Sequence, residues 1–161
     1  MSGKIIRKTK NFEKLIKKIQ KLQKAEAESG YFKEQGSHPV SDITYSGLAM
    51  LLEIKHKNVR KPTLFKMESP NFTGYLGKGL SLYLYGNVPL ESILDDIGGS
   101  MSDIATSFFG RTSSTVSANS QEWASRTGDK SPAGANTPMI FDGHLVDAWS
   151  YRTSENKLIR R

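Results

Sequence analysis

The chain has 161 residues, no cysteine and a net charge of +7 at pH 7. A chain of this length fits one domain, which buries about two thirds of the surface exposed by the unfolded chain and so forms a core without crosslinks. The absence of cysteine excludes disulfides, thiolate metal sites and cysteine nucleophiles. No apolar run approaches the roughly 18 residues of a membrane span, and the basic first residues do not resemble a signal peptide. We therefore expect a protein that is neither exported nor bound to a membrane.

The positive charge is concentrated at one end of the sequence. Residues 1–24 carry nine basic side chains and one acidic side chain, a net charge of +8. The remaining residues carry 14 basic and 15 acidic side chains, a net charge of -1. This distribution indicates one strongly basic element on a body of ordinary charge.

The basic segment, residues 1–29, predicts an amphipathic helix with Asn11 as its N-cap and Ser29-Gly30 at its end. Its apolar residues have helical spacing and are expected to form one buried stripe: Phe12, Leu15, Ile16, Ile19 and Leu22. Lysines cover the opposite side, where the candidate basic face consists of Lys14, Lys17, Lys18 and Lys21. Two interpretations are open: a surface helix docked on the core with solvated lysines, or a basic face that binds DNA phosphates or an acidic partner.

The next elements are less regular. Tyr31 to Glu34 is short enough to be a strand, and Thr44 is the expected N-cap of a second helix. That helix has an apolar side and is expected to be a core element, with its apolar residues at Leu48, Leu51, Leu52 and Ile54. Residues 71–86 fit either a glycine-punctuated strand or a short apolar helix.

A third helix is predicted to start near Pro89 and to end before Gly110. Its stripe comprises Ile93, Leu94, Ile97, Met101, Ile104, Ala105 and Phe108, and Gly98-Gly99 is a weak point at which it could kink or split. Residues 111–137 predict a long flexible loop, and Trp149 to Thr153 with Lys157 to Arg161 predict a hairpin. The whole chain, 1–161, is thus expected to be one α+β domain: a small, mainly antiparallel sheet with helices packed on one face, and a flexible loop before the C-terminal hairpin.

No motif predicts catalysis, a metal site or a cofactor. The segment from Gly74 to Gly79 resembles a phosphate loop only superficially, because no Ser or Thr follows Lys78 to bind magnesium. The three histidines, His38, His56 and His144, lack the spacing of metal ligands and are expected in surface or turn positions. Asp95 and Asp96 fit exposed helix carboxylates, and no serine lies in a nucleophile elbow. We therefore expect a protein that is not an enzyme.

Two parts of the chain resemble the tail-completion and head-tail joining proteins of long-tailed phages. In residues 31–65, the helix Ile43 to Ile54 and the segment Arg60 to Phe65 are similar to the family's alanine-rich helix and its Arg-Pro-Phe-like segment. In residues 119–153, the loop around Trp123, the segment Met139 to Leu145 and the strand from Trp149 resemble the family's loop, its Leu-Ile-Asp-Thr-Gly-Gln-Leu and its Ser-Ile-Thr-Tyr. The chain departs from the family at Phe141 and Asp142, where Asp and Thr are usual, and in the glycine-rich segment 66–89.

The resemblance implies a structural virion protein at the head-proximal end of the tail, assembled in the host cytoplasm, and either a tail-completion protein or the related tail terminator. Such a protein would form a ring, expected to be hexameric, that ends tail-tube polymerisation and provides the surface for head attachment. Its expected partners are further copies of itself, the tail tube protein and the head connector or head-completion protein, with DNA in the channel as a further contact. The residues expected at the subunit or tail-tube interface are Trp123, Phe141, Asp142, Gly143, Leu145 and Trp149. The alternative is a nucleic-acid-binding protein that uses the basic N-terminal helix.

Overall fold

The computed structural model describes residues 2–39, 42–56, 67–107, 109, 144–156 and 159–160. In these ranges the chain has the predicted α+β fold. Its helices are α1 (Ser2–Leu22), η1 (Lys33–Gln35), α2 (Tyr45–His56), α4 (Pro70–Tyr85), α5 (Leu90–Thr106) and α7 (His144–Ala148), and its strands are β1 (Ala27–Gly30), β2 (Ser150–Thr153) and β3 (Ile159–Arg160). The predicted flexible loop, residues 111–137, lies outside the described ranges.

The three strands form one antiparallel sheet in the order β1-β2-β3. Ala27 pairs with Thr153 at one end of β1, Gly30 pairs with Ser150 at the other, and Tyr151 pairs with Ile159 across the hairpin. The predicted C-terminal hairpin is therefore confirmed.

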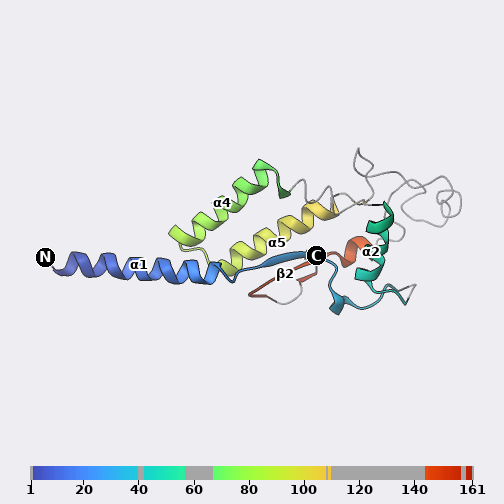
Figure 1. Cartoon of the computed structure of the whole chain (residues 1–161), viewed down its shortest axis with the longest axis horizontal. Coiled ribbons are helices and arrows are strands. Elements are labelled where there is room, and N and C mark those ends of the chain that lie inside the picture. Colours follow the sequence, from blue (N-terminus) through green and yellow to red (C-terminus); the bar gives the residue numbers. More distant parts are fainter. Residues whose placement is uncertain are drawn as a thin grey trace.

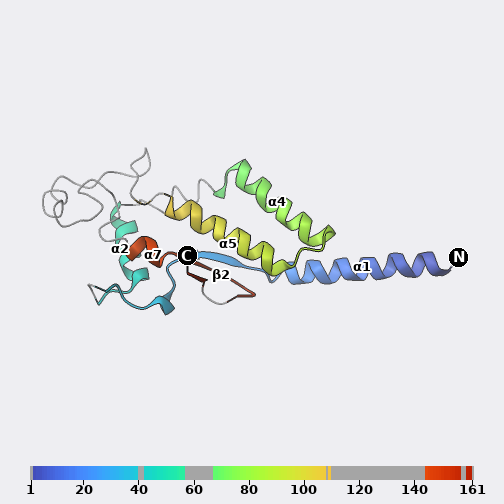
Figure 2. The ribbon, with the colours of Figure 1, turned by 180° about the vertical axis from the view of Figure 1, so that it is seen from behind.

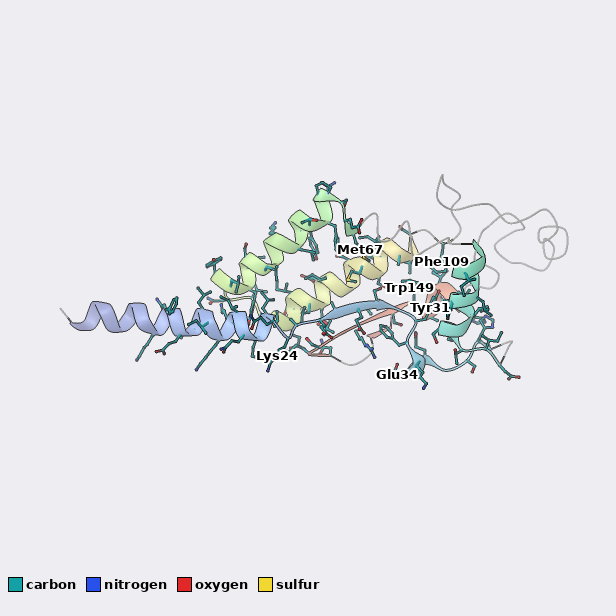
Figure 3. The ribbon with its side chains drawn as sticks, viewed as in Figure 1. Lys24, Tyr31, Glu34, Met67, Phe109 and Trp149 are labelled. Carbon is teal, nitrogen blue, oxygen red and sulfur yellow. The ribbon has the colours of Figure 1, made fainter. Side chains whose placement is uncertain are left out.

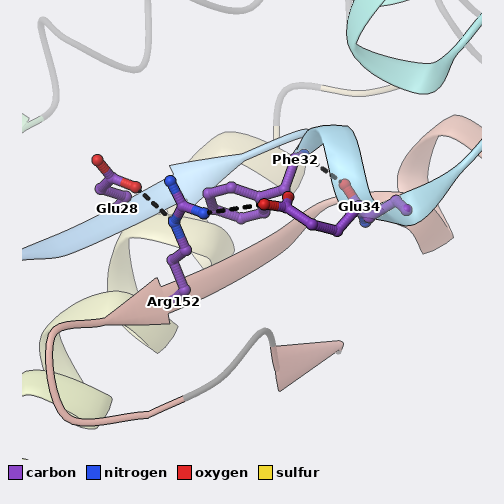
Figure 4. A network of polar contacts seen from close by, with 5 residues as sticks. Glu28, Phe32, Glu34 and Arg152 are labelled. Carbon is purple, nitrogen blue, oxygen red and sulfur yellow. Dashed lines mark hydrogen bonds and ion pairs between the residues drawn. The ribbon is translucent and has the colours of Figure 1, made fainter.

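The strand predicted at Tyr31 to Glu34 is wrong, because the pairing with β2 stops at Gly30. Immediately after it, the Phe32 N–H donates to Gln35 Oε1 at 2.6 Å, and the chain turns into η1. On the exposed side of this corner, Arg152 Nε lies 2.6 Å from Glu28 Oε2, and its Nη1 lies 3.6 Å from Glu34 Oε1 (Figure 4). The guanidinium carbon also lies 4.6 Å from the centre of the Phe32 ring. Arg152 of β2 thus contacts β1, the turn that follows it and η1.

Helices α5 and α4 form the layers above the sheet (Figure 1). Helix α5 contacts both β1 and β2, and α4 packs on α5, which confirms the expectation of helices on one face. The main core cluster lies between these layers and contains Tyr83, Leu90, Ile93 and Leu94. Helix α5 also confirms the third predicted helix: Pro89 is its N-cap, and it runs without interruption through Gly98 and Gly99.

Residues 71–86, for which strand and helix were both open, form helix α4. Ser69 is its N-cap, with Oγ accepting from the Phe72 N–H at 3.4 Å, and Pro70 occupies the first turn. A proline there costs no hydrogen bond, because the first N–H groups of a helix have no partner within it. The glycines from Gly74 to Gly79 therefore lie within a helix, not in a phosphate-binding loop.

Helix α1 is longer at its start and shorter at its end than predicted. It begins at Ser2, so Asn11 lies inside the helix rather than at its N-cap. It ends at Leu22, and Ser29-Gly30 belongs to β1 because this segment pairs with β2. Figures 1 and 2 show that most of α1 projects away from the rest of the fold, with α2 at the opposite end of the molecule.

Helix α2 has the predicted cap but not the predicted burial. Thr44 Oγ1 accepts from the Gly47 N–H at 3.1 Å, which confirms the N-cap. Leu51 and Ile54, expected in the core, are exposed, so the expectation of a core helix is wrong. The core forms where α5 meets the sheet and α4, and the main packing contacts of α2 within the described residues are with η1 and α7.

Candidate functional site

The apolar side of α1 is one of two exposed apolar surfaces on the described chain. Phe12, Ile16 and Ile19 are 63%, 38% and 42% exposed, although the amphipathic pattern predicts that they are buried. We call these three side chains the α1 stripe. Leu15 and Leu22, the other members of the predicted stripe, are half-buried, and Leu22 packs against the main core cluster. Helix α1 is therefore docked along one edge of its apolar face, and the other edge is open.

Lys18 holds α1 on the body of the protein. Its ammonium group donates to the carbonyl oxygens of Tyr83, Leu84 and Gly86 at 2.7, 3.2 and 3.1 Å, and the Tyr83 hydroxyl donates to the Lys18 carbonyl at 3.2 Å. These carbonyls belong to the last turn and the C-cap of α4. The last C=O groups of a helix have no partner within it, and the helix dipole favours a cation there. Lys18 thus acts as an intramolecular cap, and its ammonium is committed to α4 rather than to a free basic face.

The other three residues of the predicted basic face, Lys14, Lys17 and Lys21, are exposed. We call these three the lysine face. At about 100° per residue, their mean direction lies roughly 170° from that of the α1 stripe, so the two surfaces are on opposite sides of the helix. Beside the lysine face, an open groove runs between residues 17–24, which include the end of α1, and the segment 87–91. Glu91 and Glu155 are the acidic residues that line it. Helix α1 therefore presents an apolar side and a basic side at the same time.

A second exposed apolar surface lies on α2, at the far end of the molecule (Figures 1 and 2). Met50, Leu51 and Ile54 are 65%, 48% and 63% exposed, and we call them the α2 face. Ile43, just before the helix, is exposed as well. Exposed apolar clusters of this kind mark interaction sites in soluble proteins.

The comparisons with known proteins give no family for this chain. A scan against protein-family models, a search of curated proteins and a search of solved structures each returned no significant match. Within the described ranges, no helix is both long and apolar enough to cross a membrane.

Two of the six residues predicted at an interface lie in the described residues, and both contact other residues of the same chain. Leu145 and Trp149 pack against the second core cluster, which contains Ala105 and Phe109. Figure 3 labels Trp149 and Phe109 in this region. The Trp149 ring meets the Tyr31 ring edge-on at 4.9 Å, and its Nε1–H donates to Ser29 Oγ at 2.7 Å. The structure thus places them where α7 joins the sheet; their predicted role at an interface stays a prediction. Trp123, Phe141, Asp142 and Gly143 lie outside the described residues.

Tyr31 is the centre of this aromatic region. Its hydroxyl donates to the Leu145 carbonyl at 2.8 Å, and its ring stacks on Tyr45 at 6.5 Å between centroids. Burial raises the pKa of the Tyr31 hydroxyl well above its ordinary value, and the neighbouring Tyr45 adds to the rise. The contacts join α7, α2 and the segment after β1 into one packed unit.

Of the titratable residues considered for catalysis, His38, His144 and Asp95 each contact a neighbouring side chain. His38 and His144 approach each other edge-on at 5.6 Å between ring centroids. Both carboxylate oxygens of Asp95 accept from Asn156 Nδ2 at 2.9 Å, which ties α5 to the turn of the hairpin. In the described chain, no three His, Asp or Glu side chains lie together in a way that would hold a metal ion.

Sequence reasoning missed the α2 face and the role of Lys18. The α2 face looked like core because its periodicity is that of an amphipathic helix, and periodicity does not indicate whether a partner covers the apolar side. One signal was available in the sequence: Met50 next to Leu51 widens the apolar arc of α2 beyond a single core-facing stripe. Helical spacing gave one signal for Lys18: at about 100° per residue it lies closer to Leu15 and Leu22 around the helix than Lys14, Lys17 and Lys21 do.

Proposed function

We propose that this chain is a structural phage virion protein at the head-proximal end of the tail, either a tail-completion protein or a tail terminator. In this role it forms a ring that ends tail-tube polymerisation and provides the surface for head attachment. The proposal combines the resemblance of residues 31–65 and 119–153 to that family with one observation from the structure. This observation is that the α1 stripe of Phe12, Ile16 and Ile19 is uncovered in the single chain.

An uncovered stripe on a projecting helix favours an assembly protein for a physical reason. Apolar side chains exposed to water cost free energy that burial against a second protein surface recovers. The Lys18 contacts with α4 keep the helix docked at its C-terminal end, so the stripe is presented in one orientation. A subunit that presents a surface in a fixed direction, to a different surface on its neighbour, forms a closed ring when the rotation between neighbours closes.

Electron microscopy of the purified full-length chain, alone and mixed with tail tubes, tests the proposed function. We expect rings of the isolated protein, or tube ends closed by a layer of additional density at one end only. Tubes of unchanged length and open ends at saturating protein, together with no rings, would contradict the proposal.

A second function, binding of nucleic acid through α1, is favoured by the lysine face. Lys14, Lys17 and Lys21 are exposed on the side of the helix opposite the stripe, which leaves them available to phosphates. Three phosphate contacts predict a slope of about -3 in a plot of log affinity for duplex DNA against log salt concentration. Changing these three lysines to Gln, with Lys18 kept intact to hold the helix, should abolish the slope. If the isolated chain binds duplex DNA tightly with this salt dependence and forms neither rings nor tube caps, nucleic-acid binding becomes the better-supported function.

A further inference from the structure

Five exposed lysines lie along one side of α1 and the turn that ends it. They follow one another at alternating steps of four and three residues, the spacing that keeps side chains on one side of a helix: Lys10, Lys14, Lys17, Lys21 and Lys24. We call these five side chains the lysine track. It adds one lysine to each end of the lysine face, and Figure 3 labels Lys24 at the end of the helix. At 1.5 Å per residue, the track is about 21 Å long.

The track has no anionic partner within the described residues. The ion pairs there involve Arg152, and none of the five ammonium groups pairs with another side chain or carbonyl in that part of the chain. Lys18 differs, because its ammonium group is held by the carbonyls of α4. Like charges three and four residues apart destabilise a helix, so an anionic partner laid along the track would relieve repulsion.

The C-terminal half of the track forms one wall of the groove beside α1. Lys17, Lys21 and Lys24 line this wall, and the segment 87–91 lines the other. The groove has a volume of about 990 Å³, so it fits an extended chain rather than a single ion. Amide side chains that can donate to phosphate oxygens also line it: Gln20, Gln23 and Asn87.

The position and the composition of the track favour a nucleic acid among anionic partners. A membrane takes up the apolar side of a helix, and lysines reach its headgroups from the flanks of that side, whereas the lysine face lies opposite the α1 stripe. Protein–protein interfaces are depleted in lysine. Lysines spaced along a line match the regularly spaced phosphates of a nucleic-acid backbone, whose neutralisation releases counterions.

We propose that the groove between α1 and the segment 87–91 holds the phosphodiester backbone of a nucleic acid, which follows the lysine track from Lys24 to Lys10. Binding is independent of base sequence, because the ammonium groups meet phosphates rather than base edges. Glu91 and Glu155 line the same groove and would repel the backbone, which limits the affinity. The site rests on the second function above, binding of nucleic acid through α1, and adds the place where the backbone lies.

Single substitutions at the two ends of the track test its extent. In the full-length chain, Lys10→Gln and Lys24→Gln should each reduce the slope of log affinity against log salt by about 0.9 for duplex DNA and about 0.7 for single-stranded DNA. A contact with a slope of 0.9 contributes about eightfold at about 0.1 M salt, so each variant should lose about this factor in affinity. Lys33→Gln is the control, because Lys33 is an exposed lysine on η1, beyond the far end of β1. Fluorescence anisotropy with labelled duplex and single-stranded oligonucleotides measures the affinities, and circular dichroism checks the fold of each variant.

The two acids of the groove give a test of opposite sign. Glu91→Gln and Glu155→Gln should each tighten binding by about twofold to threefold, because each removes a negative charge about 7 Å from a phosphate. Glu68→Gln makes the same change of charge at an exposed position just before α4. The 16 residues of that helix place Glu68 about 24 Å from the groove, more than the Debye length of about 10 Å, so its affinity should stay unchanged.

The outcomes separate the groove from the function on which it rests. If Lys24→Gln behaves like Lys33→Gln, or the two groove glutamates behave like Glu68, the backbone does not lie in the groove, and binding through the lysine face still stands. The same holds if changing only the three residues of the lysine face removes the whole salt slope; the proposal requires a remaining slope that Lys10→Gln and Lys24→Gln then remove.

Binding of neither duplex nor single-stranded DNA would contradict both the groove and the nucleic-acid function. Poly-glutamate or anionic lipid vesicles that compete as well as DNA at equal charge would replace the nucleic acid by an acidic protein or a membrane. The tighter of the two DNA forms identifies which phosphodiester backbone the groove holds. Rings or capped tubes are scored independently, so none of these results depends on the virion function.

Discussion

Gly98 and Gly99 are neighbours in the middle of α5, but only one of them lies against another element. A Cβ atom added at Gly98 would lie 2.3 Å from Cδ2 of Tyr151 and 3.0 Å from both Cε2 and Cγ. A Cβ atom added at Gly99 would have no atom within 4 Å. Tyr151 belongs to β2, so the absence of a side chain at Gly98 lets the sheet approach the helix.

The two glycines allow the contact with Tyr151 to be measured. Replacing a glycine inside a helix with alanine favours the helix by about 1 kcal/mol, and this gain is common to Gly98→Ala and Gly99→Ala. Only Gly98→Ala also forces the Tyr151 ring or the backbone to move, and overpacking of this kind costs about 2 to 3 kcal/mol in a packed core. We therefore expect Gly99→Ala to be more stable than the unchanged chain, and Gly98→Ala to be less stable than Gly99→Ala by about 2 to 3 kcal/mol. For a domain of this size, that difference corresponds to about 4 to 12 °C in Tm.

Urea unfolding followed by circular dichroism at 222 nm measures the free energies of unfolding. Tyr151→Ala provides a second control, because the alanine at position 98 should become harmless once the ring is removed. Equal stabilities of Gly98→Ala and Gly99→Ala in the presence of Tyr151 would show that the ring does not lie against α5, and the packing described for the sheet would be wrong.

Three further predictions follow from single contacts. Lys18→Met should lower the free energy of unfolding by about 1 to 2 kcal/mol through loss of the α4 carbonyl contacts, whereas Lys17→Met at an exposed position should change it by less than about 0.5 kcal/mol in the same urea titration. Thr44→Ala removes the acceptor for the Gly47 N–H and should cost about 1 kcal/mol, with Thr44→Ser retaining most of the stability; equal losses in both would contradict the cap. Because the pKa of Tyr31 is raised in the folded state, its stabilising effect is complete below its ordinary pKa of 10.0 and is lost as the pH rises above that value. Across this range Tyr31→Phe should lose stability less steeply than the unchanged chain, by up to about 1.4 kcal/mol per pH unit in urea titrations, and parallel curves would contradict the burial of Tyr31.

Elements with strong local signals were predictable. The cap at Thr44, the start of α5 after Pro89 and the C-terminal hairpin all agree with the structure. An N-cap hydrogen bond spans three residues, and a helical stripe repeats within a single turn or two, so both are visible in a short window of sequence. Residues 71–86 gave no such signal in either direction. The structure shows that Ser69, just before this segment, caps the helix.

The location of the first strand depended on a distant partner. Ala27–Gly30 has small or polar residues and no alternation that predicts a strand, yet it pairs with Ser150–Thr153. Tyr31 and Phe32 looked more like strand residues, but they leave the sheet to pack against Trp149 and Arg152. Strand propensity describes how well a side chain fits a pleated surface, and it does not choose the partner.

The candidate site was predictable in its composition and not in its exposure. Periodicity alone indicates the amphipathic character of α1 and α2, because the apolar and polar positions are set by the 3.6-residue turn. Which apolar faces are covered, which lysine caps α4, and which of two glycines touches a tyrosine all depend on residues far apart in the chain: Lys18 and the α4 carbonyls are separated by 65 to 68 positions. Such contacts form only when α5 and the sheet have brought these segments together, and they leave the α1 stripe and the α2 face open at opposite ends.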